Sequence, residues 1–138
     1  MREIGVGLVG VGWMGKVHSN AYRAIPVVYP ELGVRPRLVH AADASADRRD
    51  YAGAVLGYAK TSADYHDLLQ DPDVDVVSIC APNFLHEEVA VAAAKAGKPF
   101  WIEKPAGRSA TETETIAEAA RAVRLVTTVG FNYRCAPA

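Results

Sequence analysis

The sequence predicts an α/β fold, in which a doubly wound parallel sheet of about six strands carries helices on both faces. Strand-like and helix-like segments alternate along the whole chain of 138 residues. The segment 74–80 is apolar with little alternation, which is typical of a strand that helices bury on both faces. Three glycines, Gly10, Gly12 and Gly15, follow the first apolar segment and indicate a tight turn from strand to helix.

The strands and the first helix follow from local patterns. The first strand is predicted at residues 4–9, and the first helix should run from Trp13 to Ile25, where Pro26 stops it because proline lacks an amide proton. Residues 26–36 form the longest irregular stretch and are predicted to be a surface loop. Later strands are expected at residues 38–42, 58–60, 74–80, 99–102 and 125–130.

Capping residues predict where the later helices begin. Thr61 and Asp64 have the spacing of a capping box, so a short helix should run from there through Leu69. Ser109 and Glu112 have the same spacing and precede an apolar stripe at helical intervals. Further helices are expected at residues 46–56 and 85–96.

The composition excludes several classes of protein. Charged residues make up 22% of the chain and the net charge is −1, so the basic excess of proteins that bind nucleic acid or anionic membranes is missing. The sequence contains no apolar run of about eighteen residues, so no membrane-spanning helix is predicted. Cys80 and Cys135 are too few for a disulfide framework, and we expect a reduced, cytoplasmic setting. His18, His40 and His66 form no cluster at the spacing of metal ligands, so no metal site is predicted.

The three glycines form a G-x-G-x-x-G motif between a predicted strand and a predicted helix, as in a Rossmann domain. Gly10 allows the tight turn, Gly12 lets a pyrophosphate approach the backbone, and Gly15 lets the helix pack close to the strand. The helix N-terminus then offers free N–H groups to the phosphates. The motif therefore predicts binding of a dinucleotide.

Asp43 ends the second predicted strand, where a carboxylate would accept hydrogen bonds from the adenosine ribose. The same charge would repel a 2′-phosphate, so NAD is expected rather than NADP. Arg48 and Arg49 lie close by and keep NADP possible. An alternative role for Asp43 is that of N-cap of the next helix.

Three further segments lie where predicted strands end, which is where ligands bind in open α/β sheets. These segments are Ala81-Pro-Asn-Phe-Leu-His86, Trp101-Ile-Glu-Lys-Pro105 and Val129-Gly-Phe-Asn-Tyr-Arg134. With the glycine motif and Asp43, they resemble the N-terminal NAD(P)-binding domain of the Gfo/Idh/MocA oxidoreductases over essentially the whole chain. The Glu-Lys-Pro tripeptide is the most specific element of this resemblance.

The resemblance implies hydride transfer between a nicotinamide cofactor and a hydroxyl-bearing carbon of a sugar, cyclitol or related polyol. Lys104 is similar to the family's active-site lysine, and an ammonium there would hydrogen-bond the reacting oxygen. Glu103 would orient Lys104 or touch the cofactor, and Pro105 would follow a cis peptide bond. Arg134 resembles an arginine that meets substrate, cofactor or a second domain.

The remaining predicted contacts with the cofactor lie in the loops after the strands. Pro82 and Asn83 resemble the loop beside the cofactor's ribose and nicotinamide, although Asn83 is equally explained as an N-cap. His86 is explained either by a cofactor contact or by packing of its helix. The residues expected to bind the cofactor are Gly10, Gly12, Trp13, Met14, Gly15, Asp43, Pro82, Asn83, His86, Glu103, Lys104 and Arg134.

The family pattern also includes a second α+β domain, which carries most substrate contacts and which the 138 residues do not contain. The chain is therefore expected to be the cofactor domain of a parent dehydrogenase that forms a homo-oligomer, and to have little activity by itself. A non-catalytic, redox-sensing module is an alternative that would not need Lys104. A methyltransferase is a third, although its cofactor has no pyrophosphate for the glycine motif.

Overall fold

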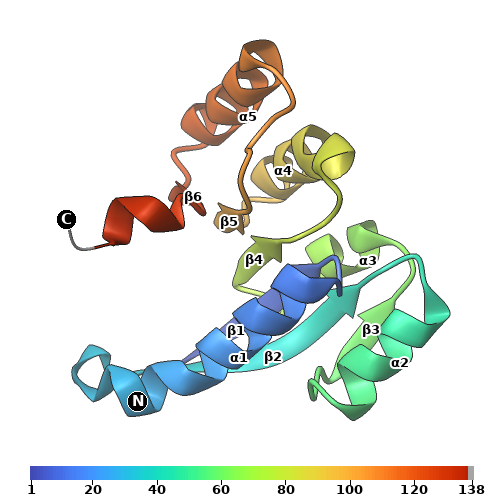
Figure 1. Ribbon diagram of the computed structural model, residues 1–138, viewed down its shortest axis with the longest axis vertical. Coiled ribbons are helices and arrows are strands. Elements are labelled where there is room, and N and C mark those ends of the chain that lie inside the picture. Colours follow the sequence, from blue (N-terminus) through green and yellow to red (C-terminus); the bar gives the residue numbers. More distant parts are fainter. Residues whose placement is uncertain (137–138) are drawn as a thin grey trace.

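The computed structural model describes residues 1–136 and contains a single six-stranded parallel sheet with the strand order β3-β2-β1-β4-β5-β6 (Figure 1). The strands are β1 (Arg2–Val9), β2 (Val34–Ala42), β3 (Lys60–Ser62), β4 (Val76–Ile79), β5 (Phe100–Ile102) and β6 (Thr127–Val129). The α-helices are α1 (Trp13–Val28), α2 (Ala46–Ala54), α3 (Tyr65–Gln70), α4 (His86–Lys95) and α5 (Ala110–Ala122). The predicted doubly wound α/β fold is confirmed.

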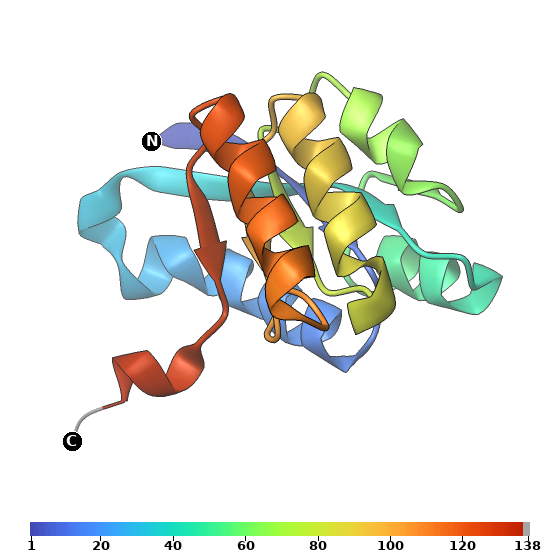
Figure 2. The same ribbon diagram turned by 90° about the horizontal axis from the view of Figure 1, so that it is seen from above.

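The helices form two layers on opposite faces of the sheet, with α1 and α2 on one face and α3, α4 and α5 on the other (Figure 2). Leu8 belongs to the apolar cluster under α2, whereas the next residue, Val9, belongs to the cluster under α3, α4 and α5. Successive side chains of a strand point to opposite faces, so a strand covered on both faces needs apolar residues at consecutive positions. This explains the unbroken apolar runs of the sequence.

The predicted end of the first helix is wrong. Pro26 lies inside α1, which continues to Val28, and the Tyr29 amide still donates to the Ile25 carbonyl at 2.8 Å. Proline lacks the amide proton of one helical hydrogen bond, and here that bond lies in the last turn, beside the exposed side chains of Val27 and Val28. The irregular stretch is consequently short, because β2 begins directly after Gly33, whose φ is 62°.

One of the two predicted capping boxes is also wrong. Thr61 belongs to β3, and Asp64 is itself the N-cap of α3, where its carboxylate accepts from the His66 amide at 2.9 Å. For the capping box at Ser109 and Glu112, the first of the two expected hydrogen bonds is confirmed, since Ser109 Oγ accepts from the Glu112 amide at 3.2 Å. The Glu112 carboxylate accepts from the Arg108 amide rather than from that of Ser109.

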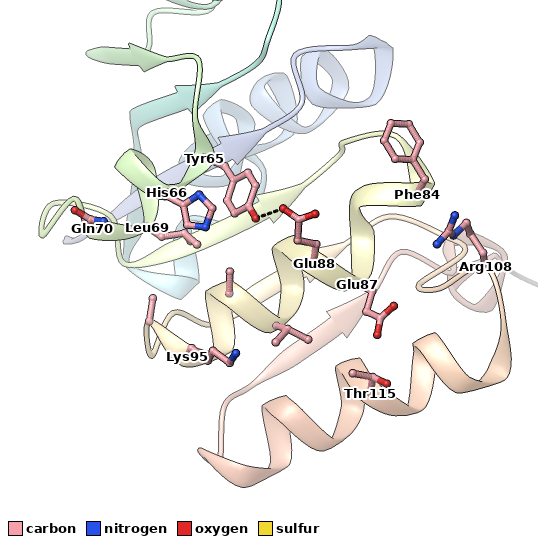
Figure 3. A pocket seen from close by; sticks show the side chains of 13 residues that line it. Tyr65, His66, Leu69, Gln70, Phe84, Glu87, Glu88, Lys95, Arg108 and Thr115 are labelled. Carbon is pink, nitrogen blue, oxygen red and sulfur yellow. Dashed lines mark hydrogen bonds between the residues drawn. The ribbon is translucent and has the colours of Figure 1, made fainter.

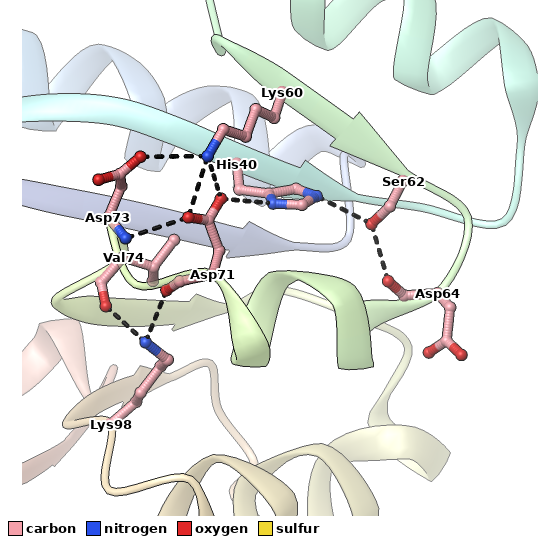
Figure 4. Close-up of polar contacts among 8 residues, drawn as sticks. All are labelled: His40, Lys60, Ser62, Asp64, Asp71, Asp73, Val74 and Lys98. Atoms are coloured by element: carbon pink, nitrogen blue, oxygen red, sulfur yellow. Dashed lines mark hydrogen bonds and ion pairs between the residues drawn. The ribbon is translucent and has the colours of Figure 1, made fainter.

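A buried polar network ties β2 and β3 to the segment between α3 and β4 (Figure 4). Asp71 lies at its centre, with one carboxylate oxygen 3.0 Å from His40 Nδ1 and both oxygens 3.0 Å from Lys60 Nζ. The Asp73 amide donates to Asp71 at 3.0 Å, and His40 Nε2 lies 3.0 Å from Ser62 Oγ. All these groups have partners, so the network can stabilise the sheet without leaving a buried polar atom unpaired.

Candidate functional site

The carboxyl ends of the strands meet at one edge of the sheet, and the strand order changes direction between β1 and β4 (Figure 1). In open α/β sheets, ligands bind in the crevice at this switch point. The glycine turn follows β1, the Asp43 segment follows β2, and the segment predicted at residues 81–86 follows β4. The segment predicted at residues 101–105 begins inside β5 and continues beyond its end. The topology therefore brings the predicted site segments to one edge.

Two of the three motif glycines are required by the fold itself. Gly10 has a φ of 93°, and a Cβ there would lie 2.6 Å from the Ala81 nitrogen. A Cβ on Gly15 would overlap the Gly10 carbonyl oxygen. At Gly12, by contrast, no heavy atom lies within 4 Å of the place a Cβ would take, and its φ of −81° suits any residue. The chain leaves open space at Gly12 that it does not use for packing.

This open space lies at the N-terminus of α1, which has the properties of an anion site. No side chain caps the helix at Gly12, and its first turn contains no acidic residue. The first amides of a helix have no partner within the helix, and they carry partial positive charge. Trp13 and Met14 stand beside the turn, with Trp13 78% exposed. The bare backbone at Gly12 and the uncapped helix together fit the diphosphate of a dinucleotide.

Asp43 binds the glycine turn instead of capping a helix. Its carboxylate accepts from the Val11 amide at 2.8 Å and from the Ser45 amide at 2.9 Å, and only 8% of its side chain is exposed. Ser45, not Asp43, is the N-cap of α2, so the N-cap alternative is wrong. Arg48 lies 3.7 Å from the carboxylate, and Arg49 donates to the Asp43 carbonyl at 2.9 Å. Asp43 thus places a nearly buried carboxylate beside the turn.

A hollow of about 260 Å³ opens between the glycine turn and the segments that follow β2 and β4. Pro82 is exposed at this edge and precedes a short 3₁₀ helix at Asn83–Leu85. Phe84 and Tyr65 contribute the aromatic part of the lining. The other residues that line it include Gly10, Ala42, Asp43, Arg48, Ala81 and Leu85.

Asn83 and His86 bind the segment after β5. Asn83 Nδ2 donates to the Pro105 carbonyl at 2.7 Å, and the structure gives α4 no side-chain cap, so the N-cap alternative for Asn83 is wrong. His86 is 2% exposed, with Nδ1 2.9 Å from the Pro105 carbonyl and Nε2 2.9 Å from the Ala81 carbonyl. Both ring nitrogens face protein carbonyls, which leaves none for a bound cofactor and favours the packing alternative.

Glu103 and Lys104 lie at the end of β5. The Lys104–Pro105 peptide bond is cis, as the resemblance implied. Glu103 Oε1 lies 2.9 Å from His18 Nε2, and Glu103 Oε2 accepts from the Lys104 amide at 3.3 Å. The Lys104 side chain is exposed and lines a hollow of about 520 Å³ together with Phe131, Asn132, Tyr133 and Arg134. Two cationic side chains from distant parts of the sequence thus share one hollow.

The chain matches the model of the oxidoreductase family with an NAD-binding Rossmann fold, Gfo/Idh/MocA, over residues 4–131. The chain belongs to this family. Levoglucosan dehydrogenase of Pseudarthrobacter phenanthrenivorans is 40% identical over the whole chain, and myo-inositol 2-dehydrogenase of Thermotoga maritima is 29% identical over 94% of it. The chain spans 35% and 36% of the lengths of these two proteins.

Two solved structures share the fold closely. An NAD-binding oxidoreductase from Klebsiella pneumoniae superposes with a TM-score of 0.92 at 40% identity, and the match covers all of this chain and 36% of the other. Levoglucosan dehydrogenase in complex with NADH and L-sorbose also gives 0.92, at 38% identity over 97% of this chain and 36% of the other. The family assignment makes the chain an NAD-binding Rossmann domain.

The contact between His18 and Glu103 was not predicted from the sequence, because His18 was considered there only as a metal ligand. In the structure, His18 lies on the buried side of α1, with Nδ1 2.7 Å from Ser78 Oγ. A signal was present in the helical spacing. Gly15 and Ser19 are buried, and His18 and Tyr22 lie on the same side of the helix, so this side, with the polar groups of three of these residues, faces the sheet.

A larger surface hollow, of about 840 Å³, runs over α3, α4 and α5 (Figure 3). Its lining is mixed, with Tyr65 donating to Glu88 across it and Lys95 and Arg108 at its rim. We place the candidate site in the crevice instead, because there the glycine turn and the strand ends converge.

Within the described part of the chain, no group of three or more metal-ligating side chains could hold a metal ion. No helix there is long and apolar enough to cross a membrane.

Proposed function

We propose that the chain is the cofactor-binding part of an NAD-dependent dehydrogenase that acts on a hydroxyl-bearing carbon of a sugar, cyclitol or related polyol. The observation that carries the proposal is the position of Lys104 on the same sheet edge as the uncapped turn at Gly12. Relatives whose names include levoglucosan and myo-inositol dehydrogenase support the substrate class.

The bound cofactor would supply the acceptor for the hydride, and the side chains of the chain would position the reactants. The first amides of α1 would hold the diphosphate at Gly12. Lys104 Nζ would hydrogen-bond the substrate oxygen whose proton leaves as the carbon is oxidised. Arg134, on the same hollow, would hold a neighbouring hydroxyl.

Asp43 supports a preference for NAD over NADP. Its nearly buried carboxylate accepts two backbone hydrogen bonds and has lone pairs left for the hydroxyls of an adenosine ribose. A 2′-phosphate would meet this negative charge at short range and in a poorly solvated place. Arg48 offsets the charge only in part, because it lies 3.7 Å away and its side chain is 56% exposed.

The substrate contacts would come mainly from a second α+β domain that follows the Rossmann domain in the complete enzyme. Phe131 and Tyr133, which line the hollow beside Lys104, are 53% and 87% exposed and are suited to packing against such a domain. We further propose that the complete enzyme is a homo-oligomer in the cytoplasm and takes small molecules rather than nucleic acid or membranes as partners. The unpaired thiols of Cys80 and Cys135 are compatible with a reducing compartment.

The test of cofactor binding uses Gly12. A side chain at this position would contact no protein atom and would obstruct only the bound cofactor. We expect Gly12→Ala to weaken NADH binding by tenfold or more, measured by calorimetry, and to leave the melting temperature nearly unchanged. The control is Gly53→Ala, which adds a methyl group in α2 at ordinary contact distance from Thr61 and should change neither property. Wild-type protein that binds no NADH, or that binds S-adenosylmethionine in its place, would refute the proposal.

The test of catalysis uses Lys104→Ala in protein that carries the substrate domain. Turnover with a polyol and NAD should fall by about 10²–10⁴, which is typical when a group that handles a proton is removed. The dissociation constant of NADH should change little. Unchanged turnover in the variant would refute the catalytic role of Lys104. No turnover in the wild type would instead favour the non-catalytic redox-sensing module.

A further inference from the structure

We propose that His18 is a positioning residue of the dehydrogenase, which holds Glu103 and, through it, the backbone that carries Lys104. The inference rests on the function proposed above. His18 lies in the helix that begins at the glycine turn, and Glu103 lies at the end of β5, 85 positions away in the sequence. The pair therefore links the diphosphate-binding helix to the segment with the proposed active-site lysine.

The hydrogen bonds around His18 have a defined direction. An ionised carboxylate only accepts, so the 2.9 Å contact with Glu103 Oε1 requires the proton on His18 Nε2. In the neutral ring, Nδ1 then accepts from Ser78 Oγ at 2.7 Å. Tyr22, one turn further along α1, packs edge-on against the imidazole with a centroid distance of 6.3 Å, and burial raises the pKa of its phenol. The imidazole is thus fixed in tautomer and orientation from both sides.

Glu103 is in turn held so that it can fix the next residue. Its side chain is 12% exposed and that of His18 is 11% exposed, so water competes little for their contact. The second carboxylate oxygen accepts from the Lys104 amide. Gly130 lies against the same group, since a Cβ there would come within 3.0 Å of Glu103 Oε1. Glu103 is therefore confined between His18 and Gly130, and Gly130 directly precedes the residues that line the hollow with Lys104.

The same residues do not form a nucleophilic site. Ser78 is completely buried in β4 and cannot reach a substrate. Cys80 Sγ lies 3.4 Å from His18 Nδ1, but burial raises the pKa of the thiol to about 12, so no thiolate forms near neutral pH. Trp101 packs edge-on against the imidazole with a centroid distance of 5.9 Å. A positioning role is what remains for a buried, oriented histidine at this place.

The first experiment measures the geometry without turnover. In labelled chain, ¹⁵N NMR should show the His18 proton on Nε2, and the Lys104 amide should exchange slowly with solvent. His18→Leu should raise the exchange rate of that amide at least fivefold, and His18→Gln should restore protection, because glutamine offers an N–H donor near the place of Nε2. The control is His66→Leu, at a half-exposed histidine that pairs with Asp64, and it should leave the Lys104 amide unchanged.

The second experiment measures turnover in protein with the substrate domain. We expect His18→Leu to lower kcat by 10- to 100-fold with KM for NAD within threefold, and His18→Gln to recover most of kcat. Glu103→Gln should give a similar loss, and the double variant should lose no more than either single variant, since both act on one contact.

Each outcome bears on one claim. Full turnover in His18→Leu, additive losses in the double variant, or a proton on Nδ1 alone would overturn the positioning role. A loss that His18→Gln does not recover would also overturn it, since such a loss reflects packing. Wild-type protein that binds no NADH would refute the proposed function instead, and the amide and tautomer measurements would still report the contact of His18 with Glu103.

Discussion

The acid sensitivity of the fold should depend on Asp71, whose carboxylate lies in the buried network of Figure 4. Burial of this carboxyl favours its neutral form, but hydrogen bonds from Lys60, the Asp73 amide and His40 outweigh burial and lower its pKa from 3.8 to about 2. A carboxyl whose pKa is lower in the folded than in the unfolded state stabilises the fold at all pH values above its unfolded pKa. That stabilisation is lost as the pH falls towards the folded pKa.

The size of the effect follows from the two pKa values. The gap between 3.8 and about 2 corresponds to about 2 kcal/mol at neutral pH, which is lost progressively between about pH 5 and about pH 1. Asp71→Asn keeps the shape of the side chain but removes the charge. It should therefore lower the free energy of unfolding by about 2 kcal/mol at pH 7 and by much less at pH 2.5.

Urea denaturation at a series of pH values from 2.5 to 7 measures this difference directly. Comparing variant with wild type at each pH cancels the contributions of the other carboxylates, among them Asp64 and Glu112, whose pKa values hydrogen bonds also lower. The matched control is Asp73→Asn, which removes an ion pair with Lys60 from a side chain that is 58% exposed and should cost less than about 1 kcal/mol. A difference between Asp71→Asn and wild type that stays constant with pH would refute the reasoning.

Three further predictions concern the turn, the cofactor and a helix cap. Gly15→Ala should destabilise the fold by about 2 kcal/mol or more and abolish NADH binding, because its Cβ would overlap the Gly10 carbonyl oxygen; a wild-type melting curve would contradict this. Asp43→Ala should weaken NADH about tenfold and reduce the preference over NADPH, as measured by titration of both, and an unchanged preference would count against the role of the carboxylate. Ser109→Ala should cost about 1 kcal/mol in urea denaturation, since the Glu112 amide loses its acceptor, and no loss would show that the cap is not needed.

The fold could be predicted from the sequence because its signals are local. The apolar runs, the glycine motif and the cap at Ser109 each lie within a few residues, and they specify strands, turns and helix starts directly. The end of the first helix and the start of the third were predicted wrongly, because the local signals at Pro26 and Thr61 depend on their surroundings in the fold. Pro26 ends a helix in general, yet its missing hydrogen bond matters little in an exposed last turn. Thr61 has the capping spacing, but pairing with Ala41 places it in β3.

The candidate site could be predicted in part, for a physical reason. Residues whose type is set by their own backbone angle or by a neighbour in sequence leave a motif. Gly10 has a φ of 93°, and a Cβ on Gly15 would overlap the Gly10 carbonyl oxygen. His18 and His86 contact residues 85 and 19 positions away, and no local pattern records such a pairing. Their partners become visible only when the strand order β1-β4-β5 brings α1 and α4 over the same strand end.

That strand order also explains why the segment with Lys104 can be held firmly at an exposed edge. On the face covered by α1, His18 contacts Glu103, which accepts from the Lys104 amide. On the face covered by α4, Asn83 and His86 contact the Pro105 carbonyl. The backbone on both sides of Lys104 is thus fixed from opposite helical layers, while its side chain stays free to reach the hollow. A lysine that must meet a reacting oxygen gains from this arrangement, since preorganised geometry reduces the ordering left to be done when substrate binds.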